Sequence, residues 1–534
     1  MLNRQESGQN GSLPQVDTKS RGKALDKMEE EYLIGIDIGT NSCKTILINS
    51  EGEIVGSASR EYPTLYPRTG WAEQNPEDWY SAFKTAFIKM TREANISPDR
   101  ISAIGVTGQM VGLTCLDKGG AVLRNTILWM DQRATSEVEW LNNNFKKKIP
   151  PITYAPINQS FTLPKILWLR EHEPFVWKQM YRLQLPKDYI RFRLTKNWFT
   201  DCSDASGTML FDLKNLEWSR EICKMVQIPL EKLPEIIPSF QIAGYVCKEV
   251  SHELGILGGT PVVAGTADLS ADNFAAGIIE PGQWITRMGT AGSTSLVIKE
   301  PVLDWQEVCF CSAHCVPGKY IVEVGTHTFG LAYRWFKDTF CDEEVTRAEK
   351  LKKNPYELIE ETVARTSIGA DGLFFHPFIT GSPYWDANLK GAFVGITPSH
   401  NRKDFARAVL EGTVFCLNDS FALLKKLTGS QLREYVLVGG GSKSRLWRQI
   451  VCDVLGRDAL VLEHCDASLG AAMLAGVGSS VFESFAEVIK KCVKTKLRAS
   501  FNKDNHARYQ SLIREFRKFH KEIQHIYGRL GKEH

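Results

Sequence analysis

Hydrophobic and polar positions alternate near the start of the chain in a pattern that predicts a β-meander. The three apolar runs that we expect to form antiparallel strands cover residues 32–38, 44–49 and 54–60. A helix is expected to begin after Asn75, because Asn75 suits the N-cap and Pro76 the first helical position. A buried strand over residues 101–107 follows that helix. Strands that alternate with helices in this way predict an α/β fold with a mixed sheet.

The second half of the chain repeats this plan from Gly282 onward. Strands are expected over residues 293–298, 319–324 and 435–438, and a helix over residues 445–455. The last strand enters that helix through Gly439, Gly440 and Gly441. A strand, a glycine-rich turn and a helix N-terminus place backbone donors where a nucleotide can lie, although a tight turn under a closely packed helix has the same pattern.

An apolar stripe at helical spacing runs along the C-terminal segment, which is otherwise rich in Lys and Arg. Its members are Tyr509, Leu512, Ile513, Phe516, Phe519, Ile523, Ile526, Tyr527 and Leu530. The spacing predicts a helix that turns this stripe toward the core. The basic residues then form its solvated face and not an anion-binding tail.

Composition and charge narrow the class of protein. A chain of 534 residues is long enough for two or three domains, and a formal net charge of +3 indicates neither a nucleic-acid nor a membrane partner. No apolar run approaches the roughly 18 residues of a membrane span. Residues 1–30 are polar and predict a disordered leader. The thirteen cysteines are scattered through apolar sequence, which is typical of reduced thiols and predicts a cytoplasmic protein.

One group of potential zinc ligands stands out, namely Cys309, Cys311, His314 and Cys315. They fall in a strand-like run over residues 308–316, where successive side chains point to opposite faces. Structural zinc sites need a second ligand pair, and none lies nearby in sequence. We therefore expect ordinary strand residues at these positions.

A Gly-Thr turn between two strands occurs twice. The first copy holds Asp37, Gly39 and Thr40, and the second holds Gly289 and Thr290. Glycine lets the backbone approach an oxyanion, and the N–H and hydroxyl groups then act as donors. Asp37 adds a carboxylate that is suited to a metal-bound water. Because no G-x-x-x-x-G-K-[ST] motif is present, the duplication indicates two similar domains that close on a nucleotide and not a P-loop fold.

The chain resembles the FGGY carbohydrate kinase family, and within it is most similar to the xylulokinases. The resemblance covers about residues 32–530 and rests on motifs in the same order, namely GIDIGT (35–40), GWAEQNPEDW (70–79), TGQM (107–110), LWMDQR (128–133), LPKDY (185–189), DCSDAS (201–206), VAGTAD (263–268), KGAFVGIT (390–397), ARAVLEG (406–412) and GGGSKS (439–444). It implies two actin-like (ribonuclease-H-like) domains, 31–280 and 281–534, with ATP and a sugar in the cleft between them. The family often dimerises, so a homodimer is one expected assembly.

The resemblance also implies a catalytic carboxylate. Asp268 matches the family's catalytic aspartate and would accept the proton of the attacking sugar hydroxyl. Asp272 is the competing candidate, but the spacing to Gly282 favours Asp268. Asp37 would help to hold Mg²⁺. Closure of the two domains would exclude water from the reaction.

ATP contacts are implied on both sides of the cleft. Thr40, Asn41 and Lys44 would surround the γ-phosphate, while Gly289 and Thr290 would contact the phosphates from the other domain. The adenosine would lie against Gly440, Gly441 and Ser444, with Gly330 on the opposite wall.

The sugar contacts depart from the xylulokinase pattern. The expected pocket residues are Gln109, Met110, Val111, Trp129, Asp131, Asp268 and the stretch 159–161. Val111 stands where xylulokinases have histidine, and Leu269 where they usually have asparagine; the Gly-Glu-Arg segment is altered to GSPY at 381–384. A sugar hydroxyl that loses its buried partner costs about 1–3 kcal/mol, enough to change the preferred substrate. D-xylulose is therefore the leading substrate, with another ketose or a polyol as the alternative.

A sugar or nucleotide sensor on the same scaffold is the competing function, because fold alone does not fix activity. The presence of Asp37, Asp268, both Gly-Thr turns and the glycine-rich turn favours an active kinase.

Overall fold

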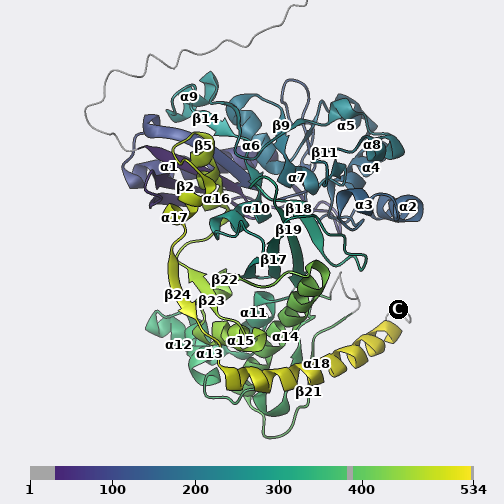
Figure 1. Cartoon of the computed structure of the whole chain (residues 1–534), viewed down its shortest axis with the longest axis vertical. Helices are drawn as coiled ribbons and strands as arrows, with labels where there is room; N and C mark the ends of the chain where they lie inside the picture. The colour runs from purple at the N-terminus through teal and green to yellow at the C-terminus, as the bar shows by residue number, and fades with distance from the viewer. Residues whose placement is uncertain (1–30, 327, 382–388, 531–534) are drawn as a thin grey trace, which may run out of the picture.

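This computed structural model describes residues 31–326, 328–381 and 389–530. The expected leader over residues 1–30, and positions 382–384 of the altered GSPY segment, lie outside the described residues. The chain forms two lobes, each built on a seven-stranded sheet, and Figure 1 shows them one above the other. The prediction of an α/β protein with two similar domains is therefore confirmed.

The first sheet forms the centre of the upper lobe. Its strands, in spatial order, are β13 (Ile242–Tyr245), β14 (Pro261–Val263), β5 (Ile101–Gly108), β1 (Tyr32–Ile38), β2 (Ser42–Asn49) and β3 (Ile54–Glu61), and the short β15 (Thr266–Ala267) also pairs with β5. Strands β1, β2 and β3 are antiparallel neighbours, whereas β5 runs parallel to β1. The predicted meander is confirmed.

The second sheet repeats the strand order of the first and adds one strand, β18, at its antiparallel end. Its order is β18 (Phe310–Ala313), β19 (Tyr320–Thr326), β17 (Gly292–Ile298), β16 (Gln283–Met288), β22 (Glu434–Val438), β23 (Ala459–Leu462) and β24 (Thr495–Ala499). As in the first sheet, three antiparallel strands (here β19, β17 and β16) are followed by two parallel strands and an antiparallel edge. The two Gly-Thr turns, β1–β2 and β16–β17, therefore occupy equivalent places.

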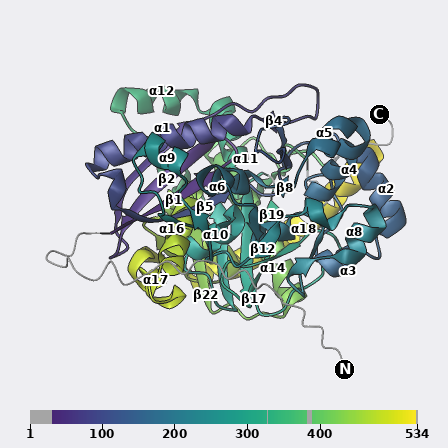
Figure 2. The same ribbon diagram turned by 90° about the horizontal axis from the view of Figure 1, so that it is seen from above.

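Helices cover both faces of the first sheet. Helix α1 (Pro76–Ala94) begins as expected, since the Asn75 side chain accepts a hydrogen bond from the Glu77 N–H. Figure 2 shows α1 on one face of the sheet and α16 (Ala467–Gly478) on the other. Helix α16 thus comes from the second half of the chain but packs on β1 and β5 and on α10 (Asp268–Ala275) of the first lobe.

Glycines allow α16 to sit directly on the sheet. A Cβ at Gly35 would lie 1.8 Å from the Ser468 carbonyl oxygen, and one at Gly105 would lie 1.9 Å from the Ala471 carbonyl oxygen. On the helix itself, a Cβ at Gly470 would lie 2.2 Å from a carbonyl oxygen of α10. No side chain fits in these contacts, so the close approach of helix and sheet depends on these glycines.

The remaining helices fall into two groups. The upper lobe also holds α2 (Thr135–Phe145), α3 (Pro150–Thr153), α4 (Thr162–His172), α5 (Pro174–Gln179), α6 (Pro186–Thr195), α7 (Cys202–Ser206), α8 (Arg220–Val226), α9 (Lys248–Leu254) and α17 (Phe485–Cys492). The lower lobe holds α11 (Gly330–Phe340), α12 (Asp342–Leu351), α13 (Pro355–Val363), α14 (Arg402–Thr428), α15 (Arg445–Leu455) and α18 (Lys503–Leu530). Among the described residues, no helix is long and apolar enough to cross a membrane.

The C-terminal helix α18 packs its apolar stripe on the lower lobe only in part. Tyr509, Ile513, Phe516 and Ile523 are buried as predicted, whereas Ile526 is 46% exposed. Figure 1 shows α18 running outward from the lobe toward its C-terminal end, so the last turns have less protein to pack against. The prediction for Ile526 was wrong, and the side chain of Leu530 lies outside the described part of the chain.

All thirteen cysteines are free thiols. Strand β18 covers only Phe310–Ala313, so the predicted strand over residues 308–316 was too long. The two ring nitrogens of His314 lie 3.1 Å from the Ile278 carbonyl oxygen and 2.9 Å from the Val316 N–H. Both ring nitrogens of this histidine are therefore hydrogen-bonded to backbone groups.

Candidate active site

A cavity of about 640 Å³ lies between the first lobe and strands β18 and β19 of the second sheet. Six residues that the sequence assigned to the site line it, namely Thr40, Gln109, Met110, Val111, Trp129 and Asp268. The expected stretch 159–161 also lines the cavity, together with Leu269 and the unforeseen Gln306, Glu307, Val308, Phe310, Glu323 and Gly325. Asp131 is buried and does not line it.

Asp268 opens helix α10 directly after strand β15. One of its carboxylate oxygens accepts a hydrogen bond of 2.8 Å from the Leu269 N–H. Burial raises the pKa of Asp268 well above its usual value, and the nearby carboxylates of Asp37 and Asp272 raise it further. Both effects favour the protonated acid, and a nearby cation would oppose them.

Asp37 lies near the end of β1, where it pairs in register with Lys44 of β2. Its Oδ1 is buried and has no hydrogen-bond partner among the described residues. Burial, reinforced by the carboxylates of Asp272 and Asp466, raises the pKa of Asp37 to about 7, and Lys44 opposes this only in part. An unpartnered buried carboxylate next to other carboxylates is suited to bind a divalent cation.

Asp272 is one helical turn after Asp268, but its surroundings differ. Its Oδ2 lies 3.2 Å from Nε of Arg287, and an Arg287 amino group lies 3.8 Å from a carboxylate oxygen of Glu323. Arg287 lowers the pKa of Asp272 and partly offsets the effect of burial. Asp272 is thus tied to a cation, whereas the described partner of the Asp268 carboxylate is a backbone N–H.

The first Gly-Thr turn is held from two sides. The Thr40 carbonyl accepts a hydrogen bond of 2.7 Å from Gln74 Nε2. The Thr40 hydroxyl accepts one of 3.2 Å from the Trp129 indole N–H. Asn41 lies in the same turn, and its carbonyl accepts from the Tyr62 N–H. The turn is therefore fixed by its neighbours while its Thr40 side borders the cavity.

The second turn is joined to the start of α11. The Gly330 N–H donates to the Gly289 carbonyl at 2.9 Å, and the Leu331 N–H donates to the Thr290 carbonyl at 3.0 Å. A Cβ on Gly330 would lie 2.5 Å from the Gly289 oxygen. The structure thus brings together Gly289, Thr290 and Gly330, although this close packing alone accounts for glycine at position 330.

In the glycine-rich turn after β22, Gly441 is tightly packed whereas Gly440 borders open space. A Cβ on Gly441 would lie 2.9 Å from the Met288 Cβ, so glycine there follows from packing. A Cβ on Gly440 would meet no atom within 4 Å. Ser444 is the N-cap of α15, because its hydroxyl accepts a hydrogen bond of 2.9 Å from the Trp447 N–H. Gly440 is therefore the position where a ligand could approach the backbone.

Sequence patterns missed several residues around the carboxylates. Arg287 and Glu323 are the only charged residues of strands β16 and β19, and a lone charge in a largely buried strand was the available signal. Asp466 precedes a helix of small apolar residues, which is the pattern of an N-cap. Gln74 donates to Thr40 and accepts from Gln109, a role that no local pattern indicates.

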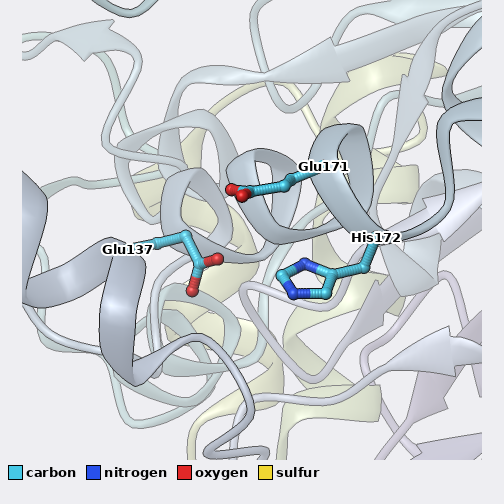
Figure 3. A group of neighbouring side chains, drawn as sticks. All are labelled: Glu137, Glu171 and His172. Atoms are coloured by element: carbon cyan, nitrogen blue, oxygen red, sulfur yellow. The ribbon is translucent and has the colours of Figure 1, made fainter.

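A separate group of possible metal ligands lies outside this cavity. Glu137 of α2 faces Glu171 and His172 at the end of α4, and Figure 3 shows their side chains turned toward one another. Their ligand atoms lie within 4.8 Å of one another, and only Glu137 is buried. None of the three lines the cavity that holds Asp268.

Comparison with known proteins agrees with this geometry. The family models of the FGGY carbohydrate kinases match residues 32–275 with the N-terminal domain and 286–479 with the C-terminal domain. The chain is 34% identical to the xylulose kinase of Bacillus subtilis strain 168, over 90% of this chain and 95% of that protein.

Two solved structures show the same fold. The ligand-bound xylulose kinase of Lactobacillus acidophilus superposes with a TM-score of 0.85, and the gluconate kinase of that species with 0.86. Each is 27% identical and aligns over 94% of this chain and 100% of its own. The chain therefore belongs to the FGGY family of carbohydrate kinases, and it is an ATP-dependent sugar kinase.

Proposed function

We propose that this kinase transfers the γ-phosphate of ATP to a hydroxyl of a neutral ketose, with D-xylulose as the first candidate and D-xylulose 5-phosphate as its product. The observation that carries the proposal is the charge of the cavity. Among the described residues that line it, the ionisable side chains are Asp268, Glu307 and Glu323, and none is Lys, Arg or His.

This charge bears on the choice between xylulose and gluconate, the substrates in the names of two of the similar proteins. Gluconate would bring a carboxylate into a cavity with three acidic side chains and no lining cation among the described residues. A desolvated anion needs a partner of opposite charge, so a neutral sugar is favoured. The 34% identity with a xylulose kinase supports the same choice.

Gln109 offers a contact for a sugar hydroxyl. Its Nε2 donates to Gln74 Oε1 at 2.9 Å, which fixes the amide, and its Oε1 is buried without a partner among the described residues. Such an acceptor gains a hydrogen bond when a hydroxyl enters the cavity. Val111 and Leu269 add an apolar patch, which suits a carbon face of the acceptor better than a hydroxyl.

Asp268 is proposed as the general base. It lines the cavity, whereas Asp272 does not and is held by Arg287. The hydrogen bond from the Leu269 N–H orients the carboxylate and favours its charged form. In a loose phosphoryl-transfer transition state the base assists late, so most of the barrier lowering comes from positioning and charge neutralisation.

The carboxylates fit a divalent cation such as Mg²⁺. Asp37 would help to hold it, because its buried Oδ1 has no partner within the described chain. The ion would neutralise negative charge on the phosphates during transfer. Its charge would also lower the pKa of Asp37 and Asp268, and so keep the proposed base in the form that accepts a proton.

The ATP contacts remain proposals of the same kind. For the phosphates we propose Thr40, Asn41, Lys44, Gly289 and Thr290, and for the adenosine Gly330, Gly440, Gly441 and Ser444. The equivalent placement of the two Gly-Thr turns and the open space at Gly440 support these assignments.

The test is ADP release with Mg-ATP across D-xylulose, other ketoses, polyols and gluconate. We expect D-xylulose or another neutral ketose to have the highest kcat/KM, and gluconate to be poor. If another neutral ketose is preferred, the proposed substrate class stands and D-xylulose is replaced as the substrate. Preference for gluconate would overturn the argument from the cavity's charge.

A further inference from the structure

Lys165 does not line the cavity, but it forms hydrogen bonds to two residues that do. Lys165 of α4 is fully buried, and its ammonium donates to the Val111 carbonyl at 3.0 Å and also to the Ser160 carbonyl. Val111 and Ser160 both line the cavity, on segments about fifty residues apart in the chain, whereas Lys165 does not line it. One side chain thus joins two parts of the wall.

Val111 needs such support because its backbone is strained. Its φ is +59°, in the left-handed region that a β-branched residue rarely adopts. The Thr162 hydroxyl donates to the same Val111 carbonyl at 3.1 Å. Gly207 leaves room for the side chain, since a Cβ there would lie 2.5 Å from Val111 Cγ1. Two donors on one carbonyl and a glycine opposite therefore fix Val111 in an unfavourable conformation.

Lys165 is costly to bury, which indicates that its hydrogen bonds matter. Burial lowers the pKa of Lys165 to about 7, while Asp131 raises it and Arg133 lowers it. Asp131 is itself bound by Arg133 at 2.7 Å and by the Ala72 N–H at 2.6 Å, so it is not a dedicated partner of the lysine. An amine keeps two donor hydrogens when it is neutral, so both carbonyl contacts can exist in either protonation state.

We propose that Lys165 is a positioning residue for the sugar acceptor: together with Thr162 it holds Val111 in the left-handed conformation and so sets the wall against which the acceptor binds. The proposal rests on the proposed function in one respect, that this cavity is the acceptor site. It predicts an effect on the acceptor and not on ATP.

The first test compares the KM for the acceptor with the KM for ATP in three variants. Lys165→Met should raise the acceptor KM about tenfold, and Thr162→Val should raise it about threefold, as loss of two hydrogen bonds or one predicts. The ATP KM should stay within about twofold for both, because neither residue borders the proposed ATP contacts. Arg170→Met is the matched control. Arg170 is also a cation of α4 that donates to a backbone carbonyl, that of Val226 at 2.7 Å, but this contact lies away from the cavity.

A double-mutant cycle separates positioning from a general structural role. Glycine adopts the left-handed conformation without strain, so in a Val111→Gly background the backbone needs less support. Lys165→Met should then raise the acceptor KM less than about threefold relative to Val111→Gly alone. If Lys165→Met has the same effect in both backgrounds, or raises both KM values equally, the proposal is overturned.

Two further arrangements keep the test decisive. If Lys165→Met does not fold, the Thr162→Val and Val111→Gly pair completes the same cycle, and an unchanged acceptor KM in Thr162→Val then overturns the proposal. The ratios are measured on whichever acceptor the wild type phosphorylates best. Failure of the proposed function would appear as a wild type that prefers gluconate, whereas failure of this inference appears in the variant ratios.

Discussion

The ammonium of Lys44 lies 2.6 Å from a carboxylate oxygen of Asp466, which links strand β2 of the first sheet to the N-cap of helix α16. Both side chains are about one-third exposed, so the pair borders solvent. Lys44 is also a proposed contact of the γ-phosphate. Because one ammonium would serve both anions, the Asp466 carboxylate would compete with ATP for Lys44.

We therefore expect Asp466→Asn to lower the KM for ATP by about two- to fivefold, the range that a partly exposed ion pair can contribute. Asparagine still caps a helix, so the melting temperature should change little. Steady-state kinetics at varied ATP and saturating sugar measure the effect. A raised KM for ATP would show that Asp466 assists nucleotide binding.

Asp466→Ala is the companion variant. It removes the ion pair and also the N-cap bond of α16, in which Asp466 Oδ1 accepts from the Leu469 N–H at 3.2 Å. Loss of a cap costs about 1 kcal/mol. Chemical denaturation should show this loss in Asp466→Ala and not in Asp466→Asn.

Mutation of the two candidate bases should distinguish them. Asp268→Asn should lower kcat by about 10²- to 10⁴-fold with little change in either KM, because it removes only the proton acceptor. Asp272→Asn should lower kcat less and lower the melting temperature, since it removes the nearer carboxylate partner of Arg287 and leaves that cation, among the described residues, only the 3.8 Å ion pair with Glu323. ADP release and thermal unfolding on both variants decide the matter, and a larger kcat loss in Asp272→Asn would make Asp272 the base.

Asp37 predicts a pH-dependent stability of the metal-free protein. Its pKa is about 7 in the folded state, against an ordinary value of 3.8, so the folded state binds the extra proton between these values. Below pH 3.8 Asp37 is protonated in both states and does not destabilise the fold. As pH rises toward 7 the unfolded state loses its proton first, so the free energy of unfolding falls. Asp37→Asn should stabilise the metal-free protein at pH 8 by at most about 4 kcal/mol, and much less at pH 4.

Magnesium supplies the control for that experiment. Added Mg²⁺ should raise the melting temperature of the wild type at pH 8 and not that of Asp37→Asn, because binding to the folded state alone stabilises it. An equal rise in both proteins would place the ion away from Asp37.

The contact between α16 and the first sheet predicts a sharp glycine requirement. Gly35→Ala would force its Cβ into the Ser468 carbonyl, so we expect a loss of about 3 kcal/mol or more, or no folded protein. Gly258→Ala is the matched control, because its Cβ would meet nothing closer than 3.6 Å and its φ is not positive. Urea denaturation of the two variants measures the difference; equal stabilities would contradict the tight contact.

Local patterns predicted the parts of the fold that local physics determines. The meander, the two Gly-Thr turns and the cap at Asn75 each depend on residues close in sequence, and the structure confirms them. The exposed Ile526 shows the limit of a periodicity argument. A stripe at helical spacing shows which face is apolar, but not where the surface that it packs against ends.

The parts of the site that sequence missed depend on contacts between distant residues. Lys165 reaches Val111 and Asp466 reaches Lys44, and neither partner lies in the same element. A weak signal existed for Lys165, which is a single cation in the apolar run of α4. It predicts burial of the lysine but not the strained carbonyl that the lysine binds, because that follows only from the tertiary arrangement.

The packing of α16 on β1 and β5 also determines when the upper lobe can finish folding during synthesis. During synthesis, the first sheet emerges from the ribosome long before residue 467, and until then the face that carries Gly35 and Gly105 has no helix on it. The upper lobe can therefore complete its core only after nearly nine-tenths of the chain has been made. A nascent or truncated chain would present a bare apolar sheet, the kind of surface that chaperones bind and that aggregates when it is left uncovered.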